Sequence, residues 1–370
     1  MTSSTRATVG MAVSGHGFGH AVRSAEVARA LLDRGARVKI RTDAPAWLFP
    51  EQAEWLPSPG WPVDTGVAKH DGLELDVDET RRRWLRFADE FEARASLEAG
   101  LLVEQGVDVL VGDIPPLAFA AASRAGIPSA ALGNFGWDWI YAAWPDFESV
   151  IAKVQAGYRL ADRLFRLPLH SADPDAFPAF RSVEDVPLIA RRATRRRREV
   201  RAELGLADES RVVLLSFGGF NTRQLDVRAL GEWPNYVFLL TPPLSLTAAD
   251  VPPNAMTLAQ SPADYVSVLS ACDAVVTKPG YGIAADVLAN RVPMLFTDRG
   301  PFREYDVLAR ALPTLGQTRY APREDVLAGR LGPHLDALFE SPANWTEQRL
   351  DGAPIVAQRL LDVACTPFDR

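Results

Sequence analysis

The chain has 370 residues, more than one hydrophobic core usually supports, so its length favours two domains. Apolar residues make up 47% and charged residues 24%, an ordinary globular composition that excludes a disordered or fibrous protein. The formal net charge of -7 gives no general attraction to nucleic acid or anionic lipid, so we expect a small-molecule substrate and no nucleic-acid partner.

Several classes of site and location are not expected from the sequence. The segment 1–8 is polar and short, and no stretch approaches the roughly 18 apolar residues that span a bilayer. We therefore expect no signal peptide, no integral membrane segment and a cytoplasmic protein. Cys272 and Cys365 lack CxxC spacing, and no DxD triplet or His/Asp cluster occurs, so we expect no disulfide, metal or cofactor.

The N-terminal half begins with a predicted βαβ unit. Residues 8–13 are apolar, the glycine loop 15–19 cannot be regular, and 21–34 carries apolar positions at helical spacing before a strand at 38–42. The same alternation follows, with strands at 107–112 and 129–132 around a helix at 117–124. Continuous apolar strands that alternate with helices imply a parallel sheet covered on both faces.

A second series of the same kind follows the segment 168–192, which is rich in Pro, Asp and Arg. Its predicted strands are 211–216, 236–241, 274–277 and 292–297, with one helix capped by Ser261-Pro262 that ends near Ala271 and another that runs to Asn290. We therefore predict an α/β protein with two Rossmann-like, doubly wound parallel-sheet domains, 1–180 and 181–350, that face a binding cleft. Residues 351–370 are predicted to form a helix that packs back toward the N-terminal domain.

The loop Gly15–His20 lies between a strand and a helix, where backbone N–H groups and the helix dipole favour an anion or a polarised hydroxyl. A dinucleotide fingerprint fails because His20 replaces its last glycine. His20 is the predicted general base, and Asp113, at the end of a neighbouring strand, its orienting group. His16 is the competing base. The plainer alternatives are a helix N-cap for His20 and a loop cap for Asp113.

The second half carries the predicted donor site. Gly218, Gly219 and Phe220 follow a strand, where glycines let the backbone approach a diphosphate. Lys278 offers a cation, and Gly280, Tyr281 and Gly282 open a helix that contains Asp286, a predicted ligand of ribose hydroxyls. The alternative is a tight turn with a solvated lysine.

An aromatic cluster follows the strand at 129–132 and is predicted to bind the acceptor. Ring faces such as that of Trp137 stack on sugars, while Asn134, Asp138 and, from the first helix, Arg23 could bind hydroxyls. An aromatic core patch is the alternative.

Two runs resemble GT-B glycosyltransferases. GHAVRSAEVARALLDRGARVKIRT looks like their opening, where the histidine of a GH motif is the base in many members. SPADYVSVLSACDAVVTKPGYGIAADVLANRVPMLF is similar to their nucleotide-sugar site, including that of the peptidoglycan N-acetylglucosaminyltransferase branch. More closely, SGHGFGHAVRS, the stretch 64–76, GNFGWDWIY and KPGYG resemble the glycosyltransferase-like N-terminal half of plant L-arabinokinases. The resemblance implies the GT-B fold, a UDP or dTDP sugar donor, and Glu304 as a contact of the donor sugar.

Two departures from the family pattern bear on the reaction. The usual acid on the donor helix is glutamate, where this chain has the shorter Asp286. Retaining members often carry two glutamates eight positions apart, and this chain has Lys278 at the first of those places, so an inverting displacement is favoured.

We therefore predict an inverting, metal-independent hexosyl- or pentosyltransferase that acts on a small-molecule or glycan hydroxyl. A nucleotide-sugar hydrolase is the first alternative, because the opening Gly19–Arg23 also resembles that of the pseudaminic-acid pathway hydrolase. A non-catalytic sugar-nucleotide-binding protein is the second. The oligomeric state is left open, with a homodimer among the alternatives.

Overall fold

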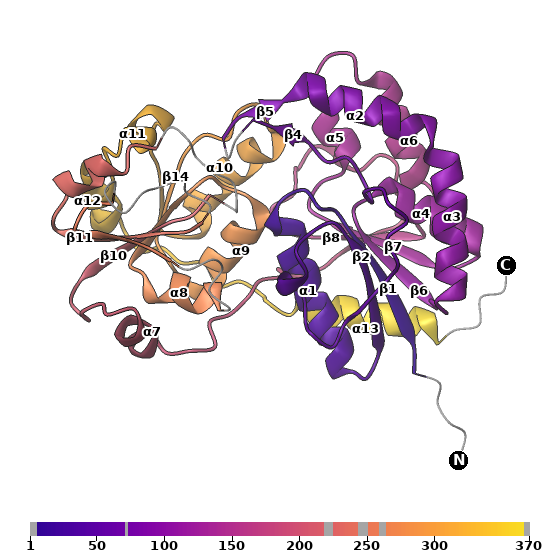
Figure 1. Ribbon diagram of the computed structural model, residues 1–370, viewed down its shortest axis with the longest axis horizontal. Coiled ribbons are helices and arrows are strands. Elements are labelled where there is room, and N and C mark those ends of the chain that lie inside the picture. Colours follow the sequence, from indigo (N-terminus) through magenta and orange to yellow (C-terminus); the bar gives the residue numbers. More distant parts are fainter. Residues whose placement is uncertain (1–5, 71–72, 218–224, 243–250, 259–263, 366–370) are drawn as a thin grey trace. The chain divides into compact units, whose positions relative to one another are not determined.

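The computed structural model describes residues 6–70, 73–217, 225–242, 251–258 and 264–365 (Figure 1). The chain divides into two compact units. Unit 1 comprises Met1–Ala68, Asp76–Ile189 and Arg349–Arg370, and unit 2 comprises Lys69–Leu75 and Ala190–Gln348. The main division therefore falls between residues 189 and 190, and a short excursion, 69–75, belongs to unit 2.

Unit 1 contains the elements of the first predicted series together with the last helix. Its strands are β1 (Thr8–Val13), β2 (Arg37–Thr42), β3 (Glu54–Trp55), β6 (Val109–Asp113), β7 (Ser129–Gly133), β8 (Arg163–Arg166) and β9 (Val183–Asp185). Its helices are α1 (Phe18–Asp33), α2 (Val77–Asp89), α3 (Phe91–Glu104), α4 (Pro116–Ala125), α5 (Trp137–Tyr141), α6 (Glu148–Tyr158) and α13 (Gly352–Ala364), with short 3-10 turns η1 (Ala46–Leu48) and η2 (Pro174–Ala176).

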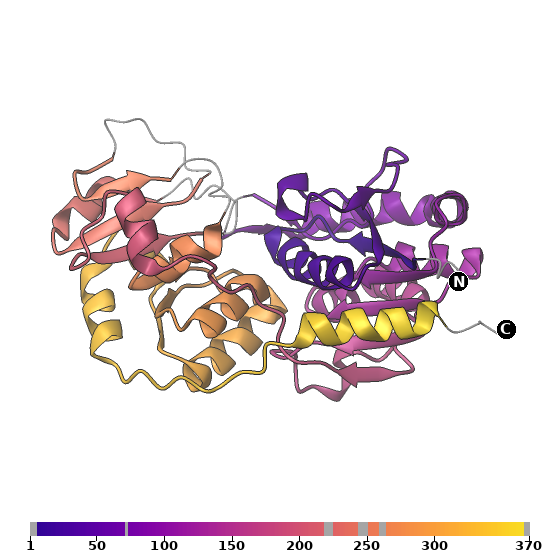
Figure 2. The ribbon, with the colours of Figure 1, turned by 90° about the horizontal axis from the view of Figure 1, so that it is seen from below.

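The described strands of unit 1 form a seven-stranded sheet in the order β3-β2-β1-β6-β7-β8-β9, with parallel pairing throughout. Helices α1 and α13 pack together on one face, where α13 is the yellow helix of Figure 2. On the other face, α3 and α4 bury Leu102 and Ala121 against Ala12 and Leu110 of the sheet. The sheet is therefore covered on both sides, which explains why its strands are continuously apolar.

Unit 2 repeats this architecture. Its strands are β10 (Arg211–Leu215), β11 (Tyr236–Leu240), β12 (Ala255–Thr257), β13 (Ala274–Thr277), β14 (Met294–Phe296) and β15 (Thr318–Tyr320). Its helices are α7 (Arg197–Glu203), α8 (Tyr265–Ala271), α9 (Tyr281–Asn290), α10 (Arg303–Leu315), α11 (Arg323–Leu327) and α12 (Gly332–Glu340), with the turn η3 (Arg228–Glu232).

The described strands of unit 2 form a six-stranded parallel sheet in the order β12-β11-β10-β13-β14-β15. Its core joins Val213, Phe238 and Leu295 of the sheet to Leu335 and Leu338 of α12. The pair β4 (Ala68–Lys69) and β5 (Leu75–Asp76) forms a separate two-stranded ladder around the excursion. The predicted fold class, two doubly wound parallel-sheet halves, is confirmed.

The strand order places a topological switch point in each unit. In unit 1, β2 and β3 extend the sheet on one side of β1, and β6 then pairs with the other side of β1. In unit 2, β11 and β12 extend the sheet on one side of β10, and β13 then pairs with its other side. Ligands of open α/β sheets bind beside the carboxyl ends of the strands at such points. The segments after β1 and β6, and those after β10 and β13, therefore lie where ligands of this class of sheet bind.

The predicted cap at Ser261-Pro262 lies outside the described residues, and α8 is capped instead by Asp264, whose side chain accepts a hydrogen bond from the Ser267 backbone N–H at 3.1 Å. Across the described residues, no helix combines the length and the apolar character that a bilayer crossing needs.

Candidate functional site

The switch point of unit 1 brings His20 and Asp113 together. Val13 and Asp113 are paired at the ends of β1 and β6, so the loop after β1 starts beside Asp113. Gly17 caps α1 with φ of 75°, a left-handed conformation that glycine adopts without strain. His20 then lies in the first turn of α1, and its Nδ1 is 2.7 Å from Asp113 Oδ1.

The Asp113 carboxylate is enclosed by donors from a single helix. Arg23 donates from Nε to Oδ2 at 2.7 Å and from Nη2 to Oδ1 at 2.5 Å, and the Ser24 hydroxyl donates to Oδ2 at 2.9 Å. Arg23 also donates from Nη1 to Asn134 Oδ1 at 2.7 Å. His20, Arg23 and Ser24 sit three and four residues apart and so share one face of α1, which explains why one carboxylate can meet all three.

Electrostatics keep Asp113 ionised. Burial raises the pKa of its carboxyl, but the charge of Arg23, the interaction with His20 and their hydrogen bonds outweigh burial and bring the pKa to about 2. An ionised carboxylate can only accept, so the shorter contact of His20 Nδ1, 2.7 Å to Asp113 against 3.0 Å to Arg23 Nη2, favours the tautomer with its proton on Nδ1. The lone pair of the imidazole is then on Nε2, the arrangement that a general base requires.

His16 occupies a different environment. Its Nδ1 accepts a hydrogen bond from the Val67 backbone N–H at 3.0 Å, and its ring meets the Trp137 ring edge-on with centroids 5.2 Å apart. Gly66 approaches so closely that a Cβ there would lie 2.7 Å from the Cβ of His16. The Val67 N–H therefore occupies the lone pair of His16 Nδ1, and the histidine that pairs with Asp113 is His20.

A second buried carboxylate, Asp64, supports this loop. Asp64 accepts hydrogen bonds from the Ser14 hydroxyl at 3.0 Å and from Trp137 Nε1 at 2.9 Å. Burial raises its pKa to about 7, against the two hydrogen bonds, which lower it. The Ser14 hydroxyl in turn accepts from the His16 backbone N–H at 3.3 Å, so Asp64 connects the glycine loop to Trp137.

The four residues predicted to bind the acceptor are all buried. Arg23 and Asn134 lie behind His20 in the Asp113 network, at 3% and 2% exposure. Trp137 is fully buried, with its ring 5.7 Å from that of His20 and stacked on Tyr141. Asp138 faces α6, where Gln155 Nε2 donates to it at 3.3 Å, and burial raises its pKa to about 6. Direct contact with an acceptor stays a prediction for these residues. In this structure Arg23 and Trp137 lie against His20.

The predicted donor residues divide into two groups. Gly218, Gly219 and Phe220 lie outside the described residues. Lys278, Gly280, Tyr281 and Gly282 lie where predicted, between the carboxyl end of β13 and the first turn of α9, with Gly280 as N-cap. This is the switch point of unit 2, and the N-terminus of α9 suits an anion.

Asp286, the predicted ribose ligand, has a protein partner in this structure. Its Oδ1 accepts from the Arg191 backbone N–H at 3.0 Å, and its Oδ2 accepts from Arg191 Nε and Nη2 at 3.1 and 2.5 Å. Asn290, one turn later on α9, bonds to Arg191 O and to the Ala193 N–H at 2.9 Å each. Helix α9 therefore fixes the first residues of unit 2, and a ribose contact of Asp286 stays a prediction.

Glu304, the predicted donor-sugar contact, is buried in the first turn of α10 and accepts from Arg299 Nη1 at 2.6 Å. Arg299 follows β14 and lies over the Phe302 ring, 4.0 Å from its centroid. Lys69 joins this group electrostatically, together with Lys278. Among the described residues, no three His, Cys, Asp or Glu side chains cluster as metal ligands would.

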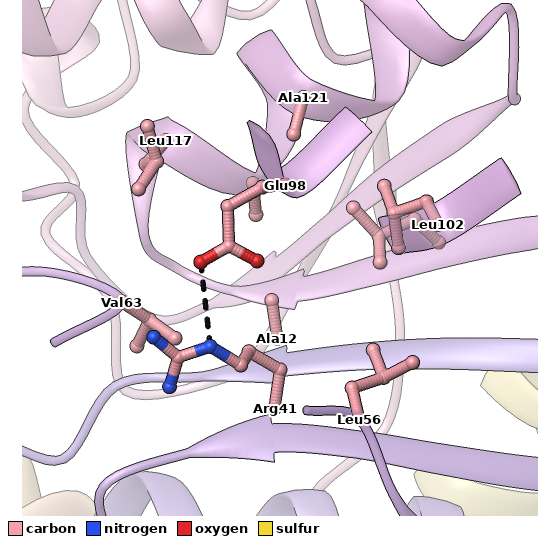
Figure 3. Close-up of a pocket in the computed structure, with 10 residues that line it drawn as sticks. Ala12, Arg41, Leu56, Val63, Glu98, Leu102, Leu117 and Ala121 are labelled. Atoms are coloured by element: carbon pink, nitrogen blue, oxygen red, sulfur yellow. Dashed lines mark hydrogen bonds and ion pairs between the residues drawn. The ribbon is translucent and has the colours of Figure 1, made fainter. Parts of the chain in front are cut away.

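A cavity elsewhere in unit 1 is too small to hold a sugar. It has a volume of about 20 Å³, room for one or two water molecules, and lies between the sheet and helices α3 and α4 (Figure 3). Its polar lining is the ion pair of Arg41 Nε with Glu98 Oε1 at 3.3 Å (Figure 3). Burial raises the pKa of Glu98, against the charge of Arg41.

Comparison with known proteins places this geometry in context. No family model matches the sequence. L-arabinokinase of Arabidopsis thaliana is 32% identical over 369 residues, which cover 95% of this chain but 34% of that protein, so the chain spans about a third of its length. A UDP-glucosyltransferase from Polygonum tinctorium superimposes with a TM-score of 0.63 at 14% identity, over 98% of this chain and 94% of that one. The glycosyltransferase VinC, solved in complex with dTDP, gives a TM-score of 0.58 at 16% identity, over 96% and 99%.

The chain has the GT-B fold. The resemblance to GT-B glycosyltransferases and to part of L-arabinokinase, proposed above from short motifs, is confirmed by these matches over nearly the whole chain.

Several residues of this GT-B chain were not singled out from the sequence. Ser24 could have been found, because it follows His20 by four positions on the same helix. Asp64 lies at the start of a stretch that resembles the arabinokinases, yet no local pattern distinguishes it from other loop acids. Lys69 and Arg299 are distant in sequence from Lys278, so only the fold indicates that their charges interact.

Proposed function

We propose that the protein is an inverting glycosyltransferase that moves a sugar from a UDP or dTDP sugar to a hydroxyl of a small molecule or glycan. The observation that carries this proposal is the buried His20–Asp113 pair at the switch point of unit 1, with 2.7 Å between Nδ1 and Oδ1. The similar solved structures, a UDP-glucosyltransferase and an enzyme in complex with dTDP, support the choice of nucleotide.

The chemistry follows from the tautomer. With its proton on Nδ1, His20 can take the acceptor hydroxyl proton on Nε2 while the acceptor oxygen bonds to the anomeric carbon. The bond from that carbon to the diphosphate oxygen breaks, and the electron pair leaves with the nucleoside diphosphate. One displacement inverts the configuration. Asp113 orients the imidazole and stabilises the imidazolium that forms.

Arg23 changes the charge balance of this pair. Before proton transfer, neutral His20, Asp113 at -1 and Arg23 at +1 sum to zero, and after it the group carries +1. Arg23 therefore fixes Asp113 in the ionised, correctly placed form, and it also opposes the charge that His20 acquires. Rigid positioning is gained at the expense of base strength.

Unit 2 supports donor binding through its own switch point. The N-terminus of α9, beginning after Gly280, offers backbone N–H groups to a diphosphate, and Lys278 adds a charge beside it. Asp286 is proposed to accept from a ribose hydroxyl at Oδ1, because each carboxylate oxygen can accept two hydrogen bonds and Arg191 supplies one to Oδ1 and two to Oδ2.

The test is turnover with a panel of UDP and dTDP sugars, with and without hydroxyl acceptors. We expect nucleoside diphosphate release that depends on acceptor, and a product whose anomeric configuration, read by NMR, is opposite to that of the donor. Equal release with and without acceptor would instead identify a hydrolase. Donor binding without release under any condition would identify a non-catalytic binding protein.

A further inference from the structure

The Arg299 guanidinium has a buried donor that the described residues leave unsatisfied. Arg299 is 8% exposed, and its Nη1 donates to Glu304 Oε2 at 2.6 Å and to Pro279 O at 3.4 Å. Its Nε is also buried, yet it has no hydrogen-bond partner among the described residues. The large majority of buried polar groups in native proteins are hydrogen-bonded, so this N–H indicates a partner that the chain itself does not supply.

The neighbours of Arg299 fix its side chain without satisfying Nε. Glu304 holds Nη1, and the guanidinium carbon lies over the Phe302 ring, 4.0 Å from its centroid. Asp298, the nearest acid in sequence, is engaged elsewhere, because its two carboxylate oxygens accept from two tyrosine hydroxyls at 3.2 and 2.8 Å. The loop after β14 therefore positions the guanidinium by one nitrogen and one face, and the Nε edge is the part that these contacts do not use.

The shape of a guanidinium determines which partner suits this edge. Nε and the neighbouring Nη2 each direct one N–H to the same side of the planar group. This fork matches two oxygens of a phosphate or a carboxylate, which it binds through two parallel, charge-assisted hydrogen bonds. An oxyanion is therefore the class of ligand that the Nε edge of Arg299 favours.

The fold places this edge beside a second feature that favours anions. Arg299 follows β14, which pairs with β13, and the chain after β13 begins α9, so both segments leave the same carboxyl edge of the sheet. A Cβ at Gly280, the N-cap of α9, would lie 3.6 Å from Arg299 Nη1. Helix α9 has 10 residues, and the first N–H groups of a helix have no carbonyl partner within it. An arginine fork and a helix N-terminus are therefore neighbours.

We propose that Arg299 is a donor-binding residue, whose Nε–Nη2 edge binds the diphosphate of the nucleotide sugar beside the N-terminus of α9. A diphosphate has two linked anionic groups, so one can lie at the helix while the other lies at the guanidinium. Every nucleoside diphosphate sugar carries this group, whereas only some carry a carboxylate on the sugar. This proposal rests on the proposed function, since it assumes a nucleoside diphosphate sugar as donor.

The experiment measures binding of UDP, dTDP and their nucleosides to the wild type, Arg299→Met, Arg299→Lys and Arg330→Met by calorimetry. Arg330 is the matched control, an arginine of unit 2 that pairs with Asp325 at the surface. For the nucleotide that the wild type binds, we expect Arg299→Met to weaken binding by about tenfold or more, because charge-assisted hydrogen bonds are lost. Arg299→Lys should recover only part of this loss, since lysine has no planar fork. Arg330→Met should bind like the wild type, and nucleoside affinity should be the same in all four proteins.

A second pair of variants keeps the test valid if Arg299→Met does not fold. Arg299→Met alone removes the ion pair of the buried Glu304 carboxylate, which lowers stability. Glu304→Gln and the double variant Arg299→Met/Glu304→Gln both lack that carboxylate. The double variant should bind the nucleotide more weakly than Glu304→Gln, again by about tenfold or more. Melting temperatures verify that each variant is folded.

A further titration identifies the oxyanion. The glucose and glucuronic acid derivatives of the nucleotide that binds differ by one carboxylate on the sugar. We expect Arg299→Met to weaken the binding of both derivatives by the same factor. A loss confined to the glucuronic acid derivative would assign the guanidinium to a sugar carboxylate and overturn the proposal.

The possible failures are distinguishable. If the wild type binds neither nucleotide, the proposed function fails. If folded Arg299→Met binds as tightly as the wild type, or the double variant as tightly as Glu304→Gln, the role of Arg299 is overturned while the proposed function stands. An equal loss of affinity for the nucleoside and the nucleotide also overturns it, because the effect would then not involve the diphosphate.

Discussion

The two switch points differ in how their charges are satisfied. In unit 1, the Asp113 carboxylate is surrounded by His20, Arg23 and Ser24, and the charges cancel without any ligand. In unit 2, the Arg299 guanidinium pairs with the buried Glu304 carboxylate, and its buried Nε has no hydrogen-bond partner among the described residues. The side chains of the first site therefore hold one another in place, whereas the second site retains a buried donor that an anionic ligand would satisfy.

The largest effect that would test this contrast is loss of the base. His20→Ala should lower turnover by about a hundredfold to ten-thousandfold, because general-base catalysis typically contributes that much. Nucleotide binding should barely change, since the proposed diphosphate ligands belong to unit 2. Nucleoside diphosphate release and donor affinity are measured in parallel.

His16→Ala is the matched variant for this measurement, and Asp113→Asn should act in the same direction as His20→Ala. If His16→Ala loses turnover while His20→Ala keeps it, the base has been assigned to the wrong histidine. If both remain fully active, the glycine loop only positions its neighbours.

The next effect concerns the partners Asp286 and Arg191. Substituting either residue by Ala removes the same ion pair, so both variants should be less stable than the wild type. The larger loss is expected for Arg191→Ala, whose free energy of unfolding should fall by about 3 to 5 kcal/mol, because this change leaves the buried Asp286 carboxylate unpaired. Only Asp286→Ala should also reduce the rise in melting temperature that UDP or dTDP produces. Equal nucleotide-induced shifts in the two variants would remove Asp286 from the ribose site.

A smaller effect is expected from Arg23→Met. Removing this charge favours the imidazolium form of His20, so the acid limb of the pH–rate profile should move to higher pH. Arg29→Met, on the same helix but paired with Glu26 at the surface, is the control and should leave the profile in place. An unchanged acid limb in folded Arg23→Met would show that Arg23 has no electrostatic influence on the base.

The smallest effect is on stability and involves Asp64. Its pKa of about 7 lies above the ordinary value of 3.8, so between these limits the native state binds a proton that the unfolded chain releases. Stability therefore falls as the pH rises from about 4 to about 7. Asp64→Asn should flatten this part of the profile of melting temperature against pH. A profile identical to that of the wild type would contradict the proposed protonation.

The sequence predicted the elements that lie at the two switch points. The strand at 8–13 and the helix that ends at Asn290 agree with the structure because their apolar patterns are long and bounded by glycines. The two-residue strands β3, β4 and β5 escaped prediction, because two residues carry no periodicity.

The meeting of His20 and Asp113 was predictable from parallel-sheet topology, since strand ends share an edge. The partners of individual side chains were not. Arg23 is separated from Asp113 by 90 residues, and Arg191 from Asp286 by 95, and nothing in either local sequence indicates that these charges meet. Burial is not readable from the sequence either: the ring of Trp137, a predicted contact of the acceptor, is fully buried in this structure.

The path of the chain has a consequence for engineering by recombination. The chain passes between the two units at residues 68/69, 75/76, 189/190 and 348/349. A chimera joined at 189/190 alone would therefore combine the unit 2 scaffold of one parent with Leu73 and Lys69 of the other. To exchange unit 2 intact, the grafted fragment has to include 69–75 and end at 348, so that α13 stays with unit 1, against which it packs.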